Sequence, residues 1–181
     1  ETKQFCGSSI WSARLGDMTW QSSLSDLHRK KNKISCLGLS DTSNLCGALE
    51  FAENVSKIGT QPIIGTQINF KFEDTIGLLP LIALNEDGYK RIIELSSRSY
   101  LENDALSDPH LDIKELLKET NGVILLSGTI HGFFGKLFEK GRFDEINKLY
   151  NELSTKFPDR FYLEIQRHGD QNEVAFEKFN L

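Results

Sequence analysis

The stretch "LPLIALNEDGYKRIIELSSRSYLE" (Leu79–Glu102) contains the clearest signal for the fold. It begins with an apolar run over residues 79–84, which has the length of a buried strand. Asn85 comes next, and an Asn directly before an amphipathic segment is typical of a helix N-cap. We therefore predict a strand that leads straight into a helix, which is the repeating unit of an α/β protein.

The same alternation continues along the rest of the chain. Apolar runs without alternation, "ISCLGL" (34–39) and "VILLSG" (123–128), predict strands covered on both faces. Further strands are predicted at residues 61–73 and 161–166. Helices are predicted at residues 21–33, 48–59, 112–122 and 142–157, and after Asn85. This order indicates an α/β protein with a largely parallel sheet.

Composition and charge narrow the classes of function. A chain of 181 residues, 39% apolar and 26% charged, is long enough to bury one core. The net charge of -5 argues against a broad, non-specific grip on nucleic acid, although DNA could still be contacted through other domains. No signal peptide opens the chain, and no apolar run reaches the roughly 18 residues of a membrane span.

The cysteines and the chain ends add two expectations. Cys6, Cys36 and Cys46 form no CxxC pair and no zinc spacing, so free thiols in a reducing cytoplasm are expected. Cys46 stands at a helix start beside Leu45, where a core position is favoured over a nucleophile. The first residue is not Met, and the last residues "EKFNL" read as helix. We therefore expect both ends to continue in a longer protein.

Polar residues follow several of the predicted strands. They are Ser40, Asp41 and Thr42; Thr66 and Gln67; Ser127, Gly128, Thr129 and His131; and Arg167 and His168. In a parallel sheet these would meet on one rim. Among them only Asp41, His131 and His168 are credible metal ligands, and catalytic metals usually have three or more. The residues alone therefore favour polar loop groups over a metal centre.

Aromatic side chains gather in one stretch of the chain. Phe133, Phe134, Phe138 and Phe143 are spaced as they are in a packed helical pair. We expect them to pack in the core rather than to form a platform on which bases stack.

Five segments, in a fixed order, carry a resemblance to a known family. They are "GLSDTSNLCGALEF", "GTQPIIGTQINF", "LPLIALNEDGYKRIIELSS", "GVILLSG" and "DRFYLEIQRHG". Together they resemble the PHP (polymerase and histidinol phosphatase) domain of the bacterial DNA polymerase III alpha subunit. The resemblance covers residues 24–169. Residues 1–23 diverge from the family's first strand, and residues 170–181 correspond to the start of the next helix.

The resemblance implies a PHP-type (β/α)7 barrel, incomplete at the C-terminus of this chain and irregular at its N-terminus. In metal-binding members of the family, His and carboxylate side chains on the rim of the barrel hold up to three metal ions. Such members hydrolyse phosphoesters, in some cases as a proofreading nuclease.

Carried over residue by residue, the family's ligand positions are mostly altered in this chain. The opening His-x-His motif falls on Cys6 and Ser8, its carboxylate on Asp17, and the Thr-Asp-His loop ends with Asp41 and Thr42. Later positions are Gln67, Thr129 and His168. Only Asp17, Asp41 and His168 remain as possible ligands, so the resemblance implies a degenerate metal site.

The function implied is that of a non-catalytic platform within a DNA-directed DNA polymerase, a nucleotidyltransferase that acts in DNA replication. Expected partners are the rest of the polymerase chain, the proofreading exonuclease subunit and other replisome subunits, and Arg167 is a candidate binding residue. No cofactor is expected, apart from a divalent metal (Zn, Mn or Mg) if the site works. The alternatives are an active metal-dependent phosphoesterase or 3′-5′ exonuclease, and a stand-alone remnant without a polymerase.

Overall fold

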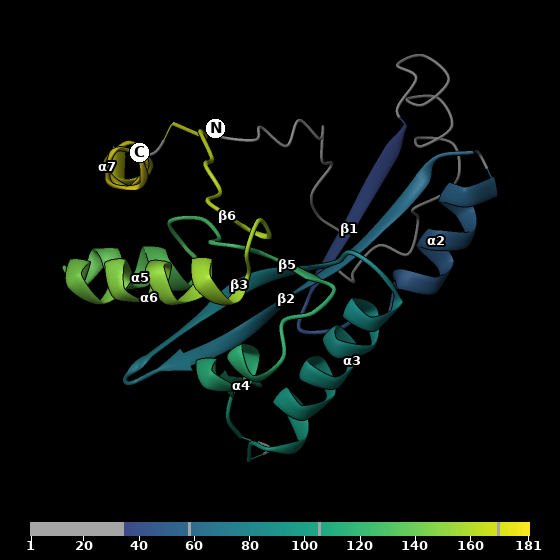
Figure 1. Ribbon diagram of the computed structural model, residues 1–181, viewed down its shortest axis with the longest axis horizontal. Coiled ribbons are helices and arrows are strands. Elements are labelled where there is room, and N and C mark those ends of the chain that lie inside the picture. The colour runs from purple at the N-terminus through teal and green to yellow at the C-terminus, as the bar shows by residue number, and fades with distance from the viewer. Residues whose placement is uncertain (1–34, 58, 105, 170) are drawn as a thin grey trace.

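The computed structural model describes residues 35–57, 59–104, 106–169 and 171–181. Its elements follow the predicted alternation (Figure 1). They are β1 (Cys36–Thr42), α2 (Ala48–Lys57), β2 (Gln61–Phe72), β3 (Thr75–Ala83), α3 (Glu86–Leu101), β4 (Leu111–Asp112), α4 (Ile113–Lys118), β5 (Val123–Leu126), α5 (Phe133–Glu139), α6 (Phe143–Lys156), β6 (Phe161–Tyr162) and α7 (Gln171–Asn180). The α/β class is confirmed, while the helix predicted at 21–33 lies outside the described residues.

The sheet is mixed, and the prediction of a largely parallel sheet is wrong. The strand order is β1-β2-β3-β5-β6, and β4 pairs with β2. The pairs β1/β2, β2/β4 and β5/β6 are parallel, whereas β2/β3 and β3/β5 are antiparallel. The cause is a tight turn at Glu73 and Asp74, where Glu73 adopts a φ of 53°. A connection that short can join only antiparallel strands.

A closed (β/α)7 barrel is not confirmed. Within the part of the chain that the structure describes, β1 pairs only with β2, and β6 pairs only with β5. In the view of Figure 1, the long β2–β3 hairpin separates α3 and α4 from α5 and α6. Over the residues that the structure describes, the arrangement is a mixed sheet that does not close, with helices packed around it.

The predicted junction between β3 and α3 is confirmed in detail. Gly88 donates its N–H to Asn85 Oδ1 at 2.9 Å, which makes Asn85 the N-cap of α3. Leu84 donates its N–H to the Gly122 carbonyl at 2.8 Å, just before β5 begins. A Cβ at Gly88 would lie 1.7 Å from that same carbonyl oxygen. Only a glycine therefore allows α3 to begin directly on the backbone of residue 122.

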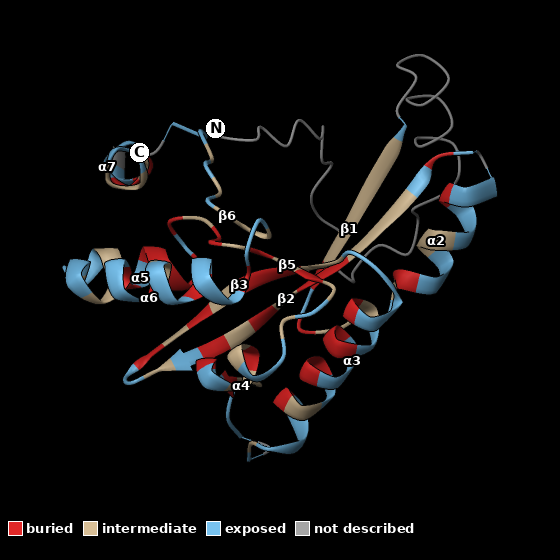
Figure 2. Cartoon of the chain, viewed as in Figure 1, coloured by how far each residue is buried: buried red, intermediate tan, exposed pale blue. Residues whose placement is uncertain are grey.

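The core lies between the sheet and one face of each of several helices (Figure 2). α3 contributes Ile92 and Leu95, and α5 contributes Phe133 and Phe134, all completely buried. Other fully buried members are Ile68 and Phe70 on β2, Leu79 and Leu81 on β3, Val123 and Leu125 on β5, and Ile146 and Leu153 on α6. The expectation of core packing is confirmed for Phe133 and Phe134, and Phe138 packs against this cluster, but it is wrong for Phe143, which is 45% exposed.

Two predicted elements are shorter in the structure. The strand predicted over residues 161–166 is limited to β6, and its last backbone bond to the neighbouring segment runs from the Ser127 N–H to the Tyr162 carbonyl at 2.9 Å. Beyond that point the Ser127 hydroxyl accepts the N–H of Glu164 at 2.9 Å. The helix predicted over 112–122 ends as α4 at Lys118. None of the helices in the described ranges is long and apolar enough to cross a membrane.

The close approach of α3 to the start of β5 gives a stability prediction. Gly88→Ala should lower the free energy of unfolding by about 2 kcal/mol or more, because the new methyl group meets a rigid carbonyl. Gly38→Ala is the matched control, since its Cβ would have no neighbour closer than 3.9 Å. The control should change stability by less than about 0.5 kcal/mol. Urea unfolding followed by circular dichroism measures both, and equal stabilities would contradict the packing described.

Candidate functional site at the ends of β1, β5 and β6

Asp41, at the end of β1, is a deeply buried acid in this region. Its exposed fraction is 4%, and its Oδ1 atom has no hydrogen-bond partner among the residues that the structure describes. Burial raises the pKa of the Asp41 carboxyl above its ordinary value of 3.8, and a hydrogen bond from the Gly47 backbone partly offsets this. Asp41, a family ligand position in the sequence, thus has a carboxyl whose neutral form is favoured by burial.

The loop that follows Asp41 is anchored by bonds to its backbone. The Thr66 hydroxyl on β2 lies 2.8 Å from the Asp41 carbonyl and 2.9 Å from the Asn44 carbonyl. The Ser96 hydroxyl on α3 donates to the Ser43 carbonyl at 3.2 Å, and Ser43 has a φ of 60°. The loop is therefore held from β2 and α3 through its backbone carbonyls, and the Asp41 carboxyl adds a hydrogen bond from the Gly47 backbone.

Thr42 and Gln67, two further family positions, are neighbours across the β1–β2 ladder. Asp41 pairs with Thr66 one step earlier in the same register. Thr42 is exposed and Gln67 is half-buried. The structure therefore brings Asp41, Thr42 and Gln67 together, and only one of the three carries a charge.

Thr129 lies in the loop after β5 and has a local hydrogen bond. Its hydroxyl accepts the backbone N–H of His131 at 3.2 Å. His131, a credible ligand from sequence alone, is exposed. Thr129 also lines a pocket beneath α7, which connects it with the segment that leads to His168.

His168 and Arg167 both contact α7. The His168 side chain is 73% exposed, and its Nδ1 lies 3.1 Å from Glu173 Oε1. Its backbone N–H donates to Glu173 Oε2 at 2.7 Å. Arg167 forms an ion pair with Glu177, which lowers the pKa of that carboxyl. A role for Arg167 in binding something outside the chain stays a prediction.

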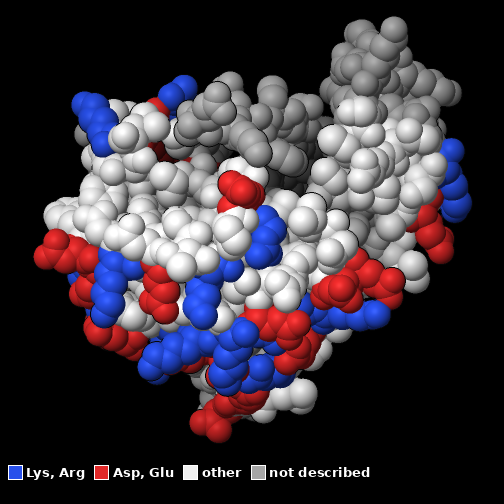
Figure 3. Space-filling view, viewed as in Figure 1, with Lys and Arg blue, Asp and Glu red and all other residues white. Residues whose placement is uncertain are grey.

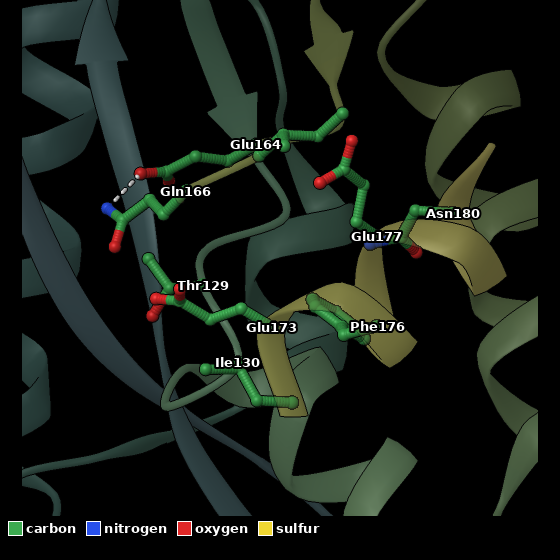
Figure 4. A pocket seen from close by; sticks show the side chains of 9 residues that line it. Thr129, Ile130, Glu164, Gln166, Glu173, Phe176, Glu177 and Asn180 are labelled. Carbon is green, nitrogen blue, oxygen red and sulfur yellow. Dashed lines mark hydrogen bonds between the residues drawn. The ribbon is translucent and has the colours of Figure 1, made fainter. Parts of the chain in front are cut away.

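The pocket beneath α7 contains an acid that sequence reasoning missed (Figure 4). Burial raises the pKa of the Glu164 carboxyl. Its Oε1 accepts a hydrogen bond from Gln166 at 2.9 Å, while no group in the described part of the chain bonds to its Oε2. The space open to the centre of a water molecule is about 10 Å³, which is room for about one water. In the sequence Glu164 stands among the polar members of an alternating strand, so nothing signals its burial.

The family positions thus form two separate groups in the structure. Asp41, Thr42 and Gln67 lie at the β1–β2 edge, and Thr129 lies with the residues that precede His168 around the pocket. Across residues 35–181, apart from the few that the structure leaves undescribed, no three His, Cys, Asp or Glu side chains gather as metal ligands would. The remaining three positions, Cys6, Ser8 and Asp17, lie outside the described residues.

The expectation for Cys46 is wrong. It is exposed rather than in the core, because it lies in the turn before α2, where its N–H donates to Asn44 Oδ1 at 3.0 Å. Cys36 on β1 is half-buried. Both are free thiols, whereas Cys6 lies outside the described residues.

Comparison with curated proteins finds alpha subunits of DNA polymerase III among the relatives of this chain. The chain is 36% identical to the DNA polymerase III subunit alpha of Caulobacter vibrioides over 158 residues, which cover 80% of this chain and 13% of that protein. For the same subunit of Vibrio cholerae the identity is 31% over 173 residues, which cover 91% and 15%. The chain therefore spans only about an eighth to a seventh of the length of these relatives.

A solved structure and a family model also match. A crystal structure from Bifidobacterium adolescentis, provisionally called a metal-dependent phosphoesterase, is 12% identical with a TM-score of 0.47, and the match covers 87% of this chain and 76% of that one. The model of the PHP domain matches residues 27–168, which is well over half of the chain. The chain therefore belongs to the PHP domain family.

Proposed function

We propose that the chain is the PHP domain of a bacterial replicative DNA polymerase, the DNA polymerase III alpha subunit, and that it acts there as a structural and docking platform. The observation that carries the proposal is the similarity to alpha subunits over at least 80% of this chain but only 13 to 15% of theirs. The body of the domain would be residues 24–169. The parent chain would be the nucleotidyltransferase, located in the cytoplasm, and this segment would not catalyse polymerisation.

We propose further that the metal site is degenerate. Divalent metals are held by carboxylate, imidazole or thiolate groups in sufficient number. At the described family positions, Asp41 supplies the one buried carboxylate. Thr42, Gln67 and Thr129 are neutral, and the His168 ring is exposed beside Glu173. These residues do not fit a cluster of metal ions, which supports a platform without hydrolytic activity.

The surface charge fits a domain that contacts proteins rather than DNA. Acidic and basic side chains are intermixed on the face seen in Figure 3, and the net charge is -5. Non-specific binding to DNA usually needs a continuous basic surface that contacts the phosphates. We therefore assign DNA contacts to other domains of the parent chain. The platform would serve the rest of the polymerase, the exonuclease subunit and other replisome subunits.

A second candidate is an active metal-dependent phosphoesterase or 3′-5′ exonuclease. The observation in its favour is the free, buried Oδ1 of Asp41, since an unpaired buried oxygen is available to a ligand. Asp41 also stands at a family ligand position. The two candidates make opposite predictions for bound metal.

The gene and the full-length protein test the leading proposal. We expect the reading frame to continue beyond Leu181 into a polymerase, and the purified full-length chain to extend a DNA primer. A reading frame without a polymerase would leave a stand-alone remnant, and the proposal would be rejected.

Metal content separates the two candidates. We expect elemental analysis of the purified protein to find far less than one Zn, Mn or Fe per chain. Hydrolysis of p-nitrophenyl phosphate and of a primer 3′ end should stay at background, and His168→Ala should change neither. Near-stoichiometric metal together with hydrolysis that His168→Ala abolishes would establish the active enzyme instead.

The raised pKa of Asp41 predicts how stability depends on pH. The folded state disfavours the ionised form, so Asp41 supports stability below pH 3.8, and this support is lost as the pH rises through the folded pKa. Asp41→Asn stays neutral, so its melting temperature should rise relative to wild type across that window. Thermal melts from pH 3 to pH 8 measure the difference, with Asp108→Asn on an exposed position as the control. A constant difference at all pH values would show that the burial of Asp41 does not matter.

A further inference from the structure

The outward face of α3 carries large apolar residues that nothing in the described chain covers. Ile93, Tyr100 and Leu101 are all exposed, Leu101 to 82%. Tyr100 and Leu101 follow Ile93 by seven and eight residues, which is two helical turns, so the three side chains lie on one stripe of the helix. We call these three residues the α3 patch. The loop that follows α3 adds Leu106, which is fully exposed.

The α3 patch is not an extension of the domain's own core. The opposite face of α3 already buries Ile92 and Leu95 completely against the sheet. The outer face of a surface helix is normally polar. Contiguous exposed apolar groups of this kind mark sites of contact with another protein surface.

The charges around the α3 patch indicate the chemistry of that surface. On α3, Lys90 is paired with Glu86 at 2.7 Å, and Arg98 is paired with Glu102 at 2.6 Å. The carboxylates of Asp104 and Asp108, in the loop beside the end of α3, form no ion pair within the described residues. The unpaired charge at this edge is therefore negative. A complementary surface would be apolar at its centre and carry Lys or Arg at its rim.

A second copy of this chain does not meet that requirement. A twofold dimer through the α3 patch would place the surface against itself. Asp104 and Asp108 would then face a helix whose basic groups, Lys90 and Arg98, are already paired. The DNA polymerase III alpha relatives, in contrast, have about 85% of their length outside the region that this chain matches.

We propose that the α3 patch is the surface on which the remainder of the polymerase chain packs, through an apolar hollow edged by Lys or Arg. This inference rests on the proposed function and adds the location of the contact. Ser97 is exposed on the same stripe, between Ile93 and Leu101, so it reports directly on whether the stripe is covered.

The test uses the full-length chain encoded by the gene, with Ser97→Cys as the probe. A matched probe, Glu152→Cys, lies on the exposed polar side of α6. Each is labelled with a maleimide in the native state and in urea, and the labelled peptides are quantified by mass spectrometry. We expect the cysteine at 97 to react at least about tenfold more slowly than the cysteine at 152, because a covered site reacts only when the contact opens. Adding Leu101→Asp should remove most of that difference.

Equal labelling rates at the two positions in the full-length chain would overturn the inference. Slow labelling of the cysteine at 97 that becomes fast when the protein is diluted would also overturn the inference. Such a result would show that the α3 patch is covered by a second copy of the chain. Primer extension by the same preparation separates the two proposals. A chain that extends primers but labels rapidly at 97 retains the proposed function and loses the docking surface, whereas a gene without a polymerase removes both.

Discussion

The fold depends on a contact between two backbones, where the first turn of α3 lies against residue 122. Asn85 caps the helix through the Gly88 N–H, and the Gly122 carbonyl accepts the N–H of Leu84. No side chain fits at position 88, because its Cβ would coincide with that carbonyl. The contact sets the position of α3 on β3 and β5. Since Ile92 and Leu95 follow on the same helix, it also places their side chains in the core.

The same helix supports the candidate site. Ser96 on α3 bonds the backbone of the loop after β1, and Thr66 on β2 bonds it from the other side. These bonds go to carbonyl groups, so they do not depend on the side chains of Thr42 and Gln67, whereas the Asp41 carboxyl adds a bond of its own from the Gly47 backbone. This explains how Asp41 can remain buried with an unpaired oxygen beside neutral Thr42 and Gln67. It also gives a physical basis for our proposal that the domain keeps its fold although its metal site is degenerate.

The two faces of α3 have different environments. The inner face is packed against the sheet, and the charges along its flanks are satisfied by pairs such as Arg98 with Glu102 and Glu115. The outer face combines the α3 patch with unpaired carboxylates in the next loop. Exposed apolar side chains do not add to the stability of the domain, whereas a group of them is typical of a contact with another protein surface. The α3 patch is therefore where we locate the platform role.

The sequence by itself determined the α/β class, the cap at Asn85, the strands at β1 and β5, and the family. These follow from local patterns: apolar runs, helix periodicity, capping residues and motif order. The expectation that β1 is covered on both faces is wrong, because most of its residues are only half-buried. Only the tertiary structure decided the β2–β3 hairpin, the short β6, the exposure of Cys46 and the partial burial of Glu164. In each of these cases the outcome depends on which segment lies alongside. β6 stops after Tyr162, whose carbonyl accepts the last bond from the segment beside it, and Glu164 lines a pocket together with residues of α7. Alternation along a chain identifies a strand-like segment, but a strand forms only where a second strand is within hydrogen-bonding reach.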